Sequence, residues 1–191
     1  VVALQKDKPI LVSSMSFQQA SRGDDFQCDM PAVPPPESLP TERQLAIDAG
    51  KLEESFMITT GEDLDIRVVD PIEWDNLKPR EPVLQAWMKT NGPVPDDRDL
   101  HRALLAYFSD SYLIDSCLIA HGRAYWDEGM QVASLDHALW FHEDFRADEW
   151  LLCTFEAERL GGGRGLARGR FYTMEGRQVA TSMQEGLMRF R

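Results

Sequence analysis

Residues 130–191 read MQVASLDHALWFHEDFRADEWLLCTFEAERLGGGRGLARGRFYTMEGRQVATSMQEGLMRFR, and this stretch decides the fold. Turn signals divide it into four strand-like runs, at about 129–142, 149–159, 164–174 and 177–189. Strands that follow one another through short turns pair in antiparallel fashion. We therefore expect a four-stranded antiparallel meander over these residues.

A helix and two further strands precede the meander. Residues 99–114 contain no Gly or Pro, and their apolar side chains recur at helical spacing: Leu100, Leu104, Leu105, Phe108 and Leu113. Residues 64–69 and 82–90 read as strands. This order of elements predicts an α+β domain in which one long helix packs on a curved antiparallel sheet.

The first third of the sequence is less regular. Residues 1–17 predict two strands around a Lys6-Asp7-Lys8 turn, and residues 18–40 predict an extended connector that contains PAVPPPESLP. Residues 41–55 predict a short helix with Thr41 as its N-cap. Because Val1 already lies in a strand-like run, we expect further residues to precede it.

A weak internal repeat relates the N-terminal strands to the meander. KPILVSSM at residues 8–15 aligns with GRQVATSM at residues 176–183, and in both a turn leads into a strand that ends in Ser-Met. The repeat predicts three parts. Residues 1–20 form the closing hairpin of an incomplete first module, residues 21–61 a linker with a short helix, and residues 62–191 a complete second module.

Composition excludes several classes of protein. Hydrophobic residues make up 43% of the 191 residues, so a packed core is expected, and the net charge of −12 argues against a general binder of nucleic acid or anionic membranes. No apolar run reaches the ~20 residues of a membrane span. The three cysteines form no CxxC pair, and His137 and His142 would lie on opposite strand faces, so neither a metal nor a cofactor is expected.

Polar residues at core-like positions are candidates for chemistry, because a buried polar group is costly unless it is paired. Ser134 and Asp136 would share one strand face, and His137 would lie on the other. Asp110 lies near the end of the predicted helix, where it is a helix-end cap, a solvated acid or a base for a water. Gln184 is either an edge-strand amide or a donor to a water or an oxyanion.

A glycine-rich loop spans residues 161–165. It precedes no helix, so a P-loop or dinucleotide site is excluded, and a hairpin turn is favoured. Four arginines cluster around it, with no acid between the first of them and Met174: Arg159, Arg164, Arg168 and Arg170. Such a strip is either a solvated surface or a contact for phosphates.

Several motifs together resemble the acyl-CoA thioesterase II family, the double hotdog thioesterases of bacteria and peroxisomes. They are YFSD at 107–110, SLDHALWFH at 134–142, FRADEWLL at 145–152, GRG at 163–165, GRFY at 169–172 and QEG at 184–186. The resemblance implies two hotdog modules, each a long helix wrapped by an antiparallel sheet. The residues after about 62 would be the C-terminal hotdog, with the N-terminal hotdog largely absent from this sequence.

The resemblance also implies an activity, the hydrolysis of fatty acyl-CoA to a free acid and CoA. By motif, the catalytic set falls on Asp110, Ser134 and Gln184, with Asp110 holding a water that the other two orient; Asp136 would be structural. Independently of the resemblance, the arginine strip offers Arg164 and Arg168 as contacts for the CoA phosphates. The family implies no metal or cofactor, and a cytoplasmic location in bacteria or a peroxisomal one in eukaryotes.

Two other functions stay open at this point. The first is a non-enzymatic acyl-CoA-binding or assembly module with vestigial catalytic groups. The second is a hotdog hydratase or dehydratase, which is disfavoured because such enzymes use a His where this sequence has Asp110. A homo-oligomer, or a second chain that completes the first hotdog, is the expected partner.

Overall fold

The computed structural model describes residues 1–19, 21–48, 50, 63–73 and 76–191. Its elements, in chain order, are β1 (Val2–Gln5), β2 (Lys8–Val12), η1 (Pro36–Ser38), α1 (Glu42–Asp48), β3 (Leu64–Val68), β4 (Val83–Thr90), α2 (Arg98–Phe108), α3 (Leu113–Ile119), β5 (Met130–Ser134), β6 (Ala138–Phe141), β7 (Leu151–Gly161), β8 (Arg164–Thr173) and β9 (Gln178–Phe190).

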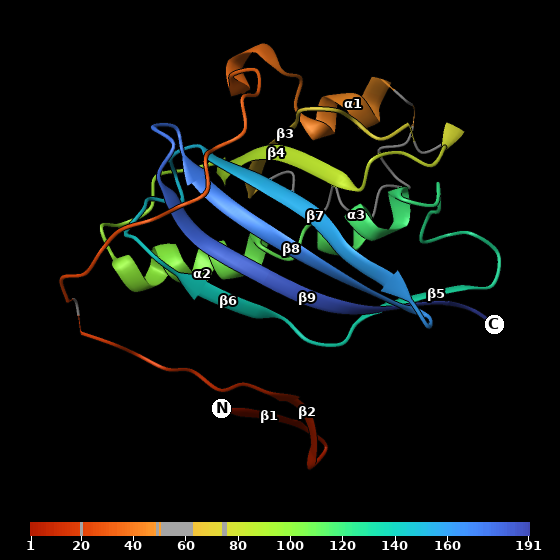
Figure 1. Ribbon diagram of the computed structural model, residues 1–191, viewed down its shortest axis with the longest axis horizontal. Coiled ribbons are helices and arrows are strands. Elements are labelled where there is room, and N and C mark those ends of the chain that lie inside the picture. Colours follow the sequence, from red (N-terminus) through yellow and green to blue (C-terminus); the bar gives the residue numbers. More distant parts are fainter. Residues whose placement is uncertain (20, 49, 51–62, 74–75) are drawn as a thin grey trace.

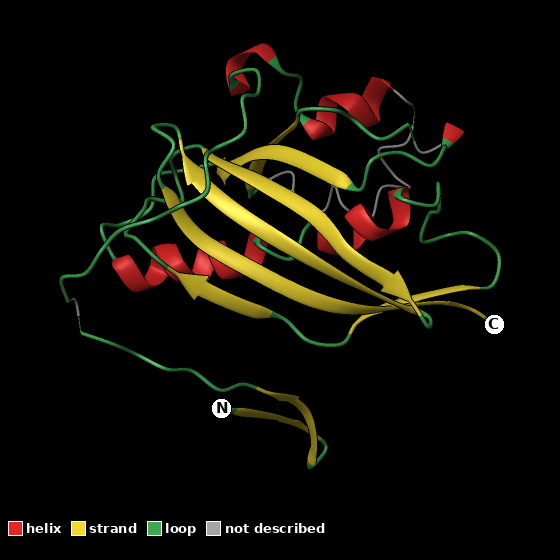
Figure 2. Ribbon diagram, in the orientation of Figure 1, coloured by secondary structure: helices red, strands yellow, loops and turns green. Residues whose placement is uncertain are grey.

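One curved antiparallel sheet dominates the structure, in the order β3-β4-β7-β8-β9-β5, with β6 also paired to β9. It curls around α2 and α3, which lie on its inner side (Figures 1 and 2). Apolar side chains from the helices and the sheet form the core between them. Phe108 and Leu113 belong to the same buried cluster as Phe155 and Phe171 of the sheet. The α+β architecture is therefore confirmed. The predicted four-stranded meander holds only for β7, β8 and β9, because the first run is divided into β5 and β6, and both of these pair with β9 instead of β7.

The prediction of one long helix over residues 99–114 is wrong. α2 ends at Phe108, and α3 begins at Leu113. Ser109 turns its hydroxyl back onto the Ala106 carbonyl, at 2.9 Å, and Tyr112 leaves the helical region with φ −130° and ψ 10°. Serine and aspartate side chains compete for backbone hydrogen bonds in this way, so the run Ser109-Asp110-Ser111 ends the helix despite a continuous apolar stripe.

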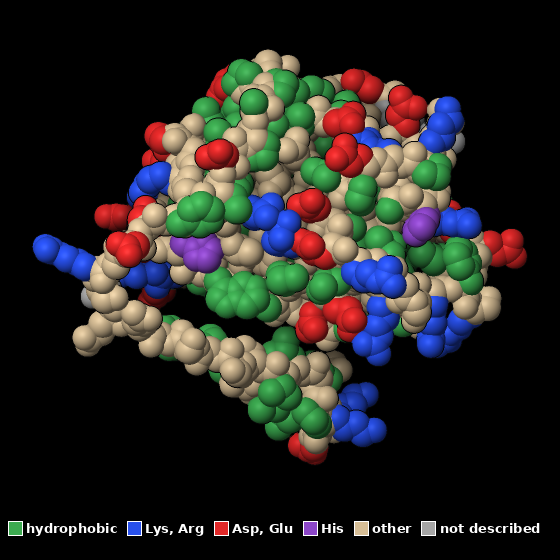
Figure 3. Space-filling model, viewed as in Figure 1, with side chains coloured by type: hydrophobic (Ala, Val, Ile, Leu, Met, Phe, Trp, Pro, Cys, Tyr) green, Lys and Arg blue, Asp and Glu red, His purple; other side chains and the backbone are tan. Residues whose placement is uncertain are grey.

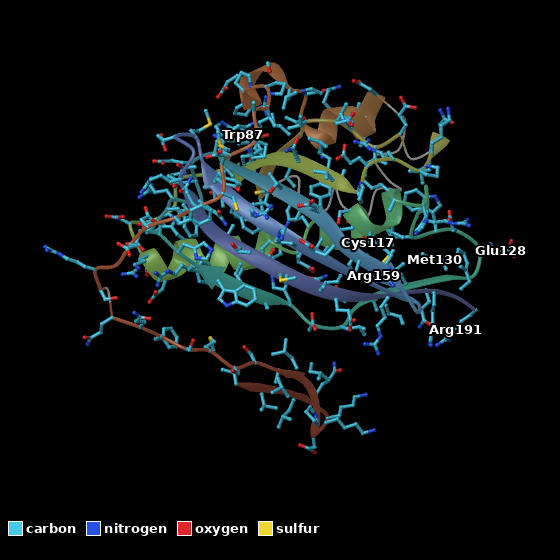
Figure 4. All side chains as sticks on the ribbon, in the orientation of Figure 1. Trp87, Cys117, Glu128, Met130, Arg159 and Arg191 are labelled. Carbon is cyan, nitrogen blue, oxygen red and sulfur yellow. The ribbon has the colours of Figure 1, made fainter. Side chains whose placement is uncertain are left out.

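The connector forms a strap across the outer face of the sheet. Trp87 of β4 donates its indole N–H to the Pro34 carbonyl at 2.9 Å, and Figure 4 shows this residue near the sheet end that the strap crosses. Arg67 donates to the carbonyls of Pro36 and Leu39. The strap covers an apolar cluster of Trp87, Leu152 and Tyr172, so the Pro-rich segment shields this part of the outer face of the sheet from solvent.

The N-terminal hairpin has the predicted two strands and turn. Lys6 and Asp7 adopt φ values of 49° and 61°, as both central residues of a type I′ turn require. The hairpin lies apart from the sheet, and its apolar side chains are open to solvent (Figure 3). Ile10 is 63% exposed and Val12 76% exposed, so this two-stranded unit buries almost none of the apolar surface that normally stabilises a hairpin.

α1 begins as predicted, because the Gln44 amide donates to the Thr41 hydroxyl at 3.0 Å. It ends at Asp48, and the rest of the helix predicted over residues 41–55 lies outside the described residues, apart from Gly50.

Glycines on the central strands let α3 lie directly against the sheet. A Cβ on Gly165 of β8 would stand 2.7 Å from the sulfur of Met188 and 2.8 Å from that of Cys117. In Figure 4, Cys117 projects from α3 toward the strand ends near Arg159. The helix can approach this closely only because β8 carries no side chain at that point.

Gly165→Ala should therefore lower the free energy of unfolding by about 1–3 kcal/mol, as expected for an overpacked core. Gly92→Ala is the control, since a Cβ there meets nothing within 4 Å. Urea unfolding of both variants measures the difference. Equal stabilities would contradict the close approach of α3 and β8.

Candidate active site

Ser134 and Gln184 are brought together by the pairing of β5 with β9. Ser134, the last residue of β5, lies opposite Gly186, two residues after Gln184. The Gln184 side chain is buried, with 1% of its surface exposed, and its Nε2 donates to Ser134 Oγ at 2.8 Å. The two residues assigned by motif to one task therefore share a hydrogen bond.

His137 joins this pair, contrary to the expectation that it faces away. Its Nδ1 lies 2.6 Å from Gln184 Oε1, and its Nε2 lies 2.9 Å from Ser109 Oγ. The expectation assumed one regular strand, whereas residues 135–137 separate β5 from β6. Strict alternation of side chains holds only within a continuous strand, so it fails across this break.

Asp136 stabilises the break between β5 and β6. Its Oδ1 accepts a hydrogen bond from the backbone N–H of Glu185 at 2.8 Å, and the Leu135 N–H donates to the Glu185 carbonyl at 2.9 Å. Both contacts tie residues 135–137 to β9 beside Gln184. This geometry supports a structural role for Asp136.

Asp110 lies in the turn between α2 and α3, immediately after the buried Ser109. Its carboxylate is exposed, and within the described part of the chain it makes no hydrogen bond or ion pair with Ser134 or Gln184. The connection is indirect: Ser109 contacts His137, which contacts Gln184. The structure thus brings two of the three candidates into contact and tethers the turn that carries the third.

A buried acid, Asp115, and a half-buried acid, Glu42, were not found from the sequence. Asp115 of α3 is 1% exposed and accepts a hydrogen bond from the Tyr125 hydroxyl at 2.9 Å; Glu42 of α1 accepts one from Tyr112 at 2.5 Å. Burial raises the pKa of both carboxyls, and that of Asp115 reaches about 7. The sequence feature that could have revealed Asp115 is an acid within the otherwise apolar helix sequence LIDSCLI.

The arginine strip is ion-paired rather than bare. Arg164 meets Glu185 at 2.7 Å, and Arg168 meets Glu156 at 2.9 Å and Glu158 at 2.6 Å. The strip looked unopposed in sequence because its acidic partners come from the neighbouring strands β7 and β9. Arg164 is the more accessible of the two, with 58% of its side chain exposed against 28% for Arg168.

A cleft of about 490 Å³ lies elsewhere in the described part of the molecule. It is lined by residues such as Arg98 and His101 at the start of α2 and by Trp150 before β7. Asp110 lies beyond the other end of α2, so this cleft is not where the candidate residues meet. Among the described residues, no cluster of three or more His, Cys, Asp or Glu side chains could hold a metal, and no described helix is long and apolar enough to cross a membrane.

The acyl-CoA thioesterase family model matches residues 77–187, which include all of the candidate residues above. The chain belongs to the acyl-CoA thioesterase family. Over its full length it is 34% identical to acyl-CoA thioesterase 2 of Haemophilus influenzae, and this match covers 68% of that protein.

Solved structures agree with this family and with its fold. An acyl-CoA thioesterase II from Mycobacterium marinum is 39% identical and superposes with a TM-score of 0.71, over 91% of this chain and 60% of that one. A protein with a hot dog fold from Alicyclobacillus acidocaldarius, 17% identical, has a TM-score of 0.66 over 91% of this chain and 59% of that one. The fold is a hotdog, and the chain spans about 60–68% of the length of these family members.

Asp115→Asn should make the protein more stable than the parent as pH rises. The raised pKa means that protonated Asp115 stabilises the fold fully below the unfolded value of about 3.9, and that this contribution is lost as pH rises through about 7. Asparagine keeps the acceptor for Tyr125 and does not ionise. The variant should gain up to about 4 kcal/mol over the parent across this range, at about 1.4 kcal/mol per pKa unit.

Urea unfolding at a series of pH values measures this difference. Asp24→Asn, at an exposed acid of the connector, is the control and should follow the parent at every pH. A constant offset between Asp115→Asn and the parent from about pH 4 to about pH 8 would show that Asp115 does not titrate in this range.

Proposed function

We propose that this chain hydrolyses fatty acyl-CoA thioesters to a free acid and CoA, with Asp110, Ser134 and Gln184 as its catalytic residues. Membership of the acyl-CoA thioesterase family supports the reaction. The observation that carries the choice of residues is the hydrogen bond from Gln184 to Ser134, since it joins two motif residues that are fifty positions apart in sequence.

Water is the nucleophile in this proposal. Ser134 Oγ accepts a hydrogen bond from Gln184, while both ring nitrogens of His137 are occupied by Gln184 and Ser109. Among the described residues, no imidazole is therefore placed to take the Ser134 proton, as a serine nucleophile requires. Asp110, exposed in its turn, is the group able to accept a proton from a water.

The reaction then balances as follows. The water oxygen bonds to the thioester carbonyl carbon as its proton passes to the Asp110 carboxylate. The second N–H of Gln184 and the hydroxyl of Ser134 orient this water. When the tetrahedral intermediate collapses, the C–S bond breaks, and the sulfur of CoA leaves as thiolate or takes the proton from Asp110. A thiol of ordinary pKa, about 8.5, is a good enough leaving group to need little further assistance.

The N-terminal hairpin belongs, in our proposal, to a first hotdog module that pairs with the module described here. Its exposed apolar side chains and its correspondence with the β8–β9 hairpin support this reading. On this proposal residues 1–20 close the first module, residues 21–61 link the two, and residues 62–191 form the second. The remainder of the first module would come from further residues of the protein or from a partner chain.

Asp110→Asn should lower kcat for acyl-CoA hydrolysis by about a hundredfold or more, because it removes the proton acceptor. Ser134→Ala and Gln184→Ala should each lower kcat by about tenfold or more through loss of the oriented water. Thiol release from acyl-CoAs of several chain lengths is the readout. Asp99→Asn, an acid with 93% of its side chain exposed at the other end of α2, is the matched control.

An unchanged rate in Asp110→Asn would refute that assignment. If the full-length parent protein binds acyl-CoA but releases no thiol, the chain is instead an acyl-CoA-binding module, and the hydrolase proposal fails.

We further propose that Arg164 and Arg168 contact the CoA phosphates. Arg164→Ala should raise KM with little change in kcat, and Arg168→Ala should raise it less, because Arg168 is held by two glutamates. Steady-state kinetics at low salt measure both. If neither substitution changes KM, the strip is a surface of ion pairs without a role in binding.

A further inference from the structure

Four side chains form one continuous hydrogen-bonded chain across the active site. It runs from Ser109 to His137 at 2.9 Å, from His137 to Gln184 at 2.6 Å, and from Gln184 to Ser134 at 2.8 Å. Ser109 closes α2, His137 lies in the break between β5 and β6, and Gln184 lies on β9. The chain therefore joins three separate segments of the fold, and Asp110 follows directly after its first member.

The positions of the hydrogens follow from counting donors and acceptors. Gln184 presents Oε1 to His137, and a carbonyl oxygen only accepts, so His137 Nδ1 must carry a hydrogen. With a neutral ring, Nε2 then has none and accepts the single hydrogen of the Ser109 hydroxyl, which in this state does not donate to the Ala106 carbonyl. With a charged ring, Nε2 donates to Ser109, whose hydroxyl turns to the Ala106 carbonyl at 2.9 Å. Nδ1 donates to Gln184 in both states.

From this we infer that His137 is a positioning residue: its Nδ1–H holds the Gln184 amide with Nε2 toward Ser134. A primary amide turned by 180° has nearly the same shape, so packing alone does not select its orientation. The hydrogen bond from His137 selects one of the two amide orientations. It acts through Gln184 and touches neither the water nor the substrate.

The orientation of the Gln184 amide matters because it determines which group is the donor in the hydrogen bond between Gln184 and Ser134. When Gln184 donates to Ser134 Oγ, the Ser134 hydrogen remains free to point at a water or at the thioester oxygen. In the reverse orientation Ser134 would donate its hydroxyl hydrogen to the amide oxygen, and this hydrogen could not bind a water or the substrate. His137 thus decides whether Ser134 can serve as a donor in the active site.

The kinetic test uses three substitutions at one position, and it rests on the proposed hydrolase function. His137→Ala removes the donor and should lower kcat about threefold to tenfold, the usual effect of one neutral hydrogen bond, with KM unchanged. His137→Asn should recover most of this loss, because its amide nitrogen occupies the place of Nδ1. His137→Gln should not, since its amide reaches the place of Nε2. His121→Ala, at an exposed histidine after α3, is the control.

A double-mutant cycle distinguishes positioning from a general loss of structure. If His137 acts through Gln184, then His137→Ala should have almost no further effect on kcat in a Gln184→Ala background. Additive losses, equal losses in all three His137 variants, or a kcat for His137→Ala equal to that of the parent would each overturn the inference. An inactive parent protein would instead refute the proposed function.

A second readout needs no activity at all. Two-bond ¹⁵N–¹H correlation spectra of the imidazole rings, at about pH 8.5 where an ordinary imidazole is neutral, report which nitrogen carries the hydrogen. The His137 signals, assigned by their loss in His137→Asn, should show the Nδ1–H tautomer. The Nε2–H tautomer would mean that the Gln184 amide is reversed, and the inference would be wrong.

Discussion

The candidate active site depends on the burial of one amide. Gln184 lies on β9 with 1% of its surface exposed, and a buried amide without partners costs on the order of 1–3 kcal/mol. Both of its polar atoms are satisfied, one by Ser134 and the other by His137. Ser134 is the last residue of β5 and His137 lies in the break at residues 135–137, so the two hydrogen bonds of the amide fix where the edge of the sheet bends.

The same constraint reaches the helices. His137 also hydrogen-bonds to Ser109, which lies at the end of α2 and directly precedes Asp110. Glycines on the inner face of the sheet then let α3 lie close to β8 and β9, with Gly186 against Ile114 and Gly165 against Cys117. The turn that presents Asp110 is therefore held from two directions, by a hydrogen-bonded chain on one side and by close packing on the other.

The strands were predictable because alternation and turn residues are local signals. Short connections correctly gave the pairing of β7, β8 and β9. They did not give the pairing of β5 and β6 with β9, which joins the first predicted strand of the meander to the last. Two local predictions failed because side-chain hydrogen bonds interrupted a regular element. Ser109 ended the predicted helix early. Asp136 bonded to β9 in the break between β5 and β6, and because of this break His137 points toward Gln184 instead of away from it. Periodicity assumes uninterrupted elements, so it cannot register either interruption.

The site was only partly visible in the sequence. Ser134 and Gln184 stood out as polar residues within strands, and family resemblance gave them a shared task. Their contact depends on the register of β5 against β9, which no local pattern specifies. Asp115 was overlooked because a lone acid in a helix is usually solvated, and the acids that neutralise Arg164 and Arg168 lie on other strands.

In the proposed mechanism a water, oriented by this network, attacks the thioester directly, and Ser134 is never acylated. Rapid-quench intact-mass spectrometry during turnover of an acyl-CoA tests it, because a serine nucleophile would accumulate as an acyl-enzyme. The protein should keep its unmodified mass at every time point while thiol is being released. A transient mass increase equal to the acyl group and located on Ser134 would contradict it.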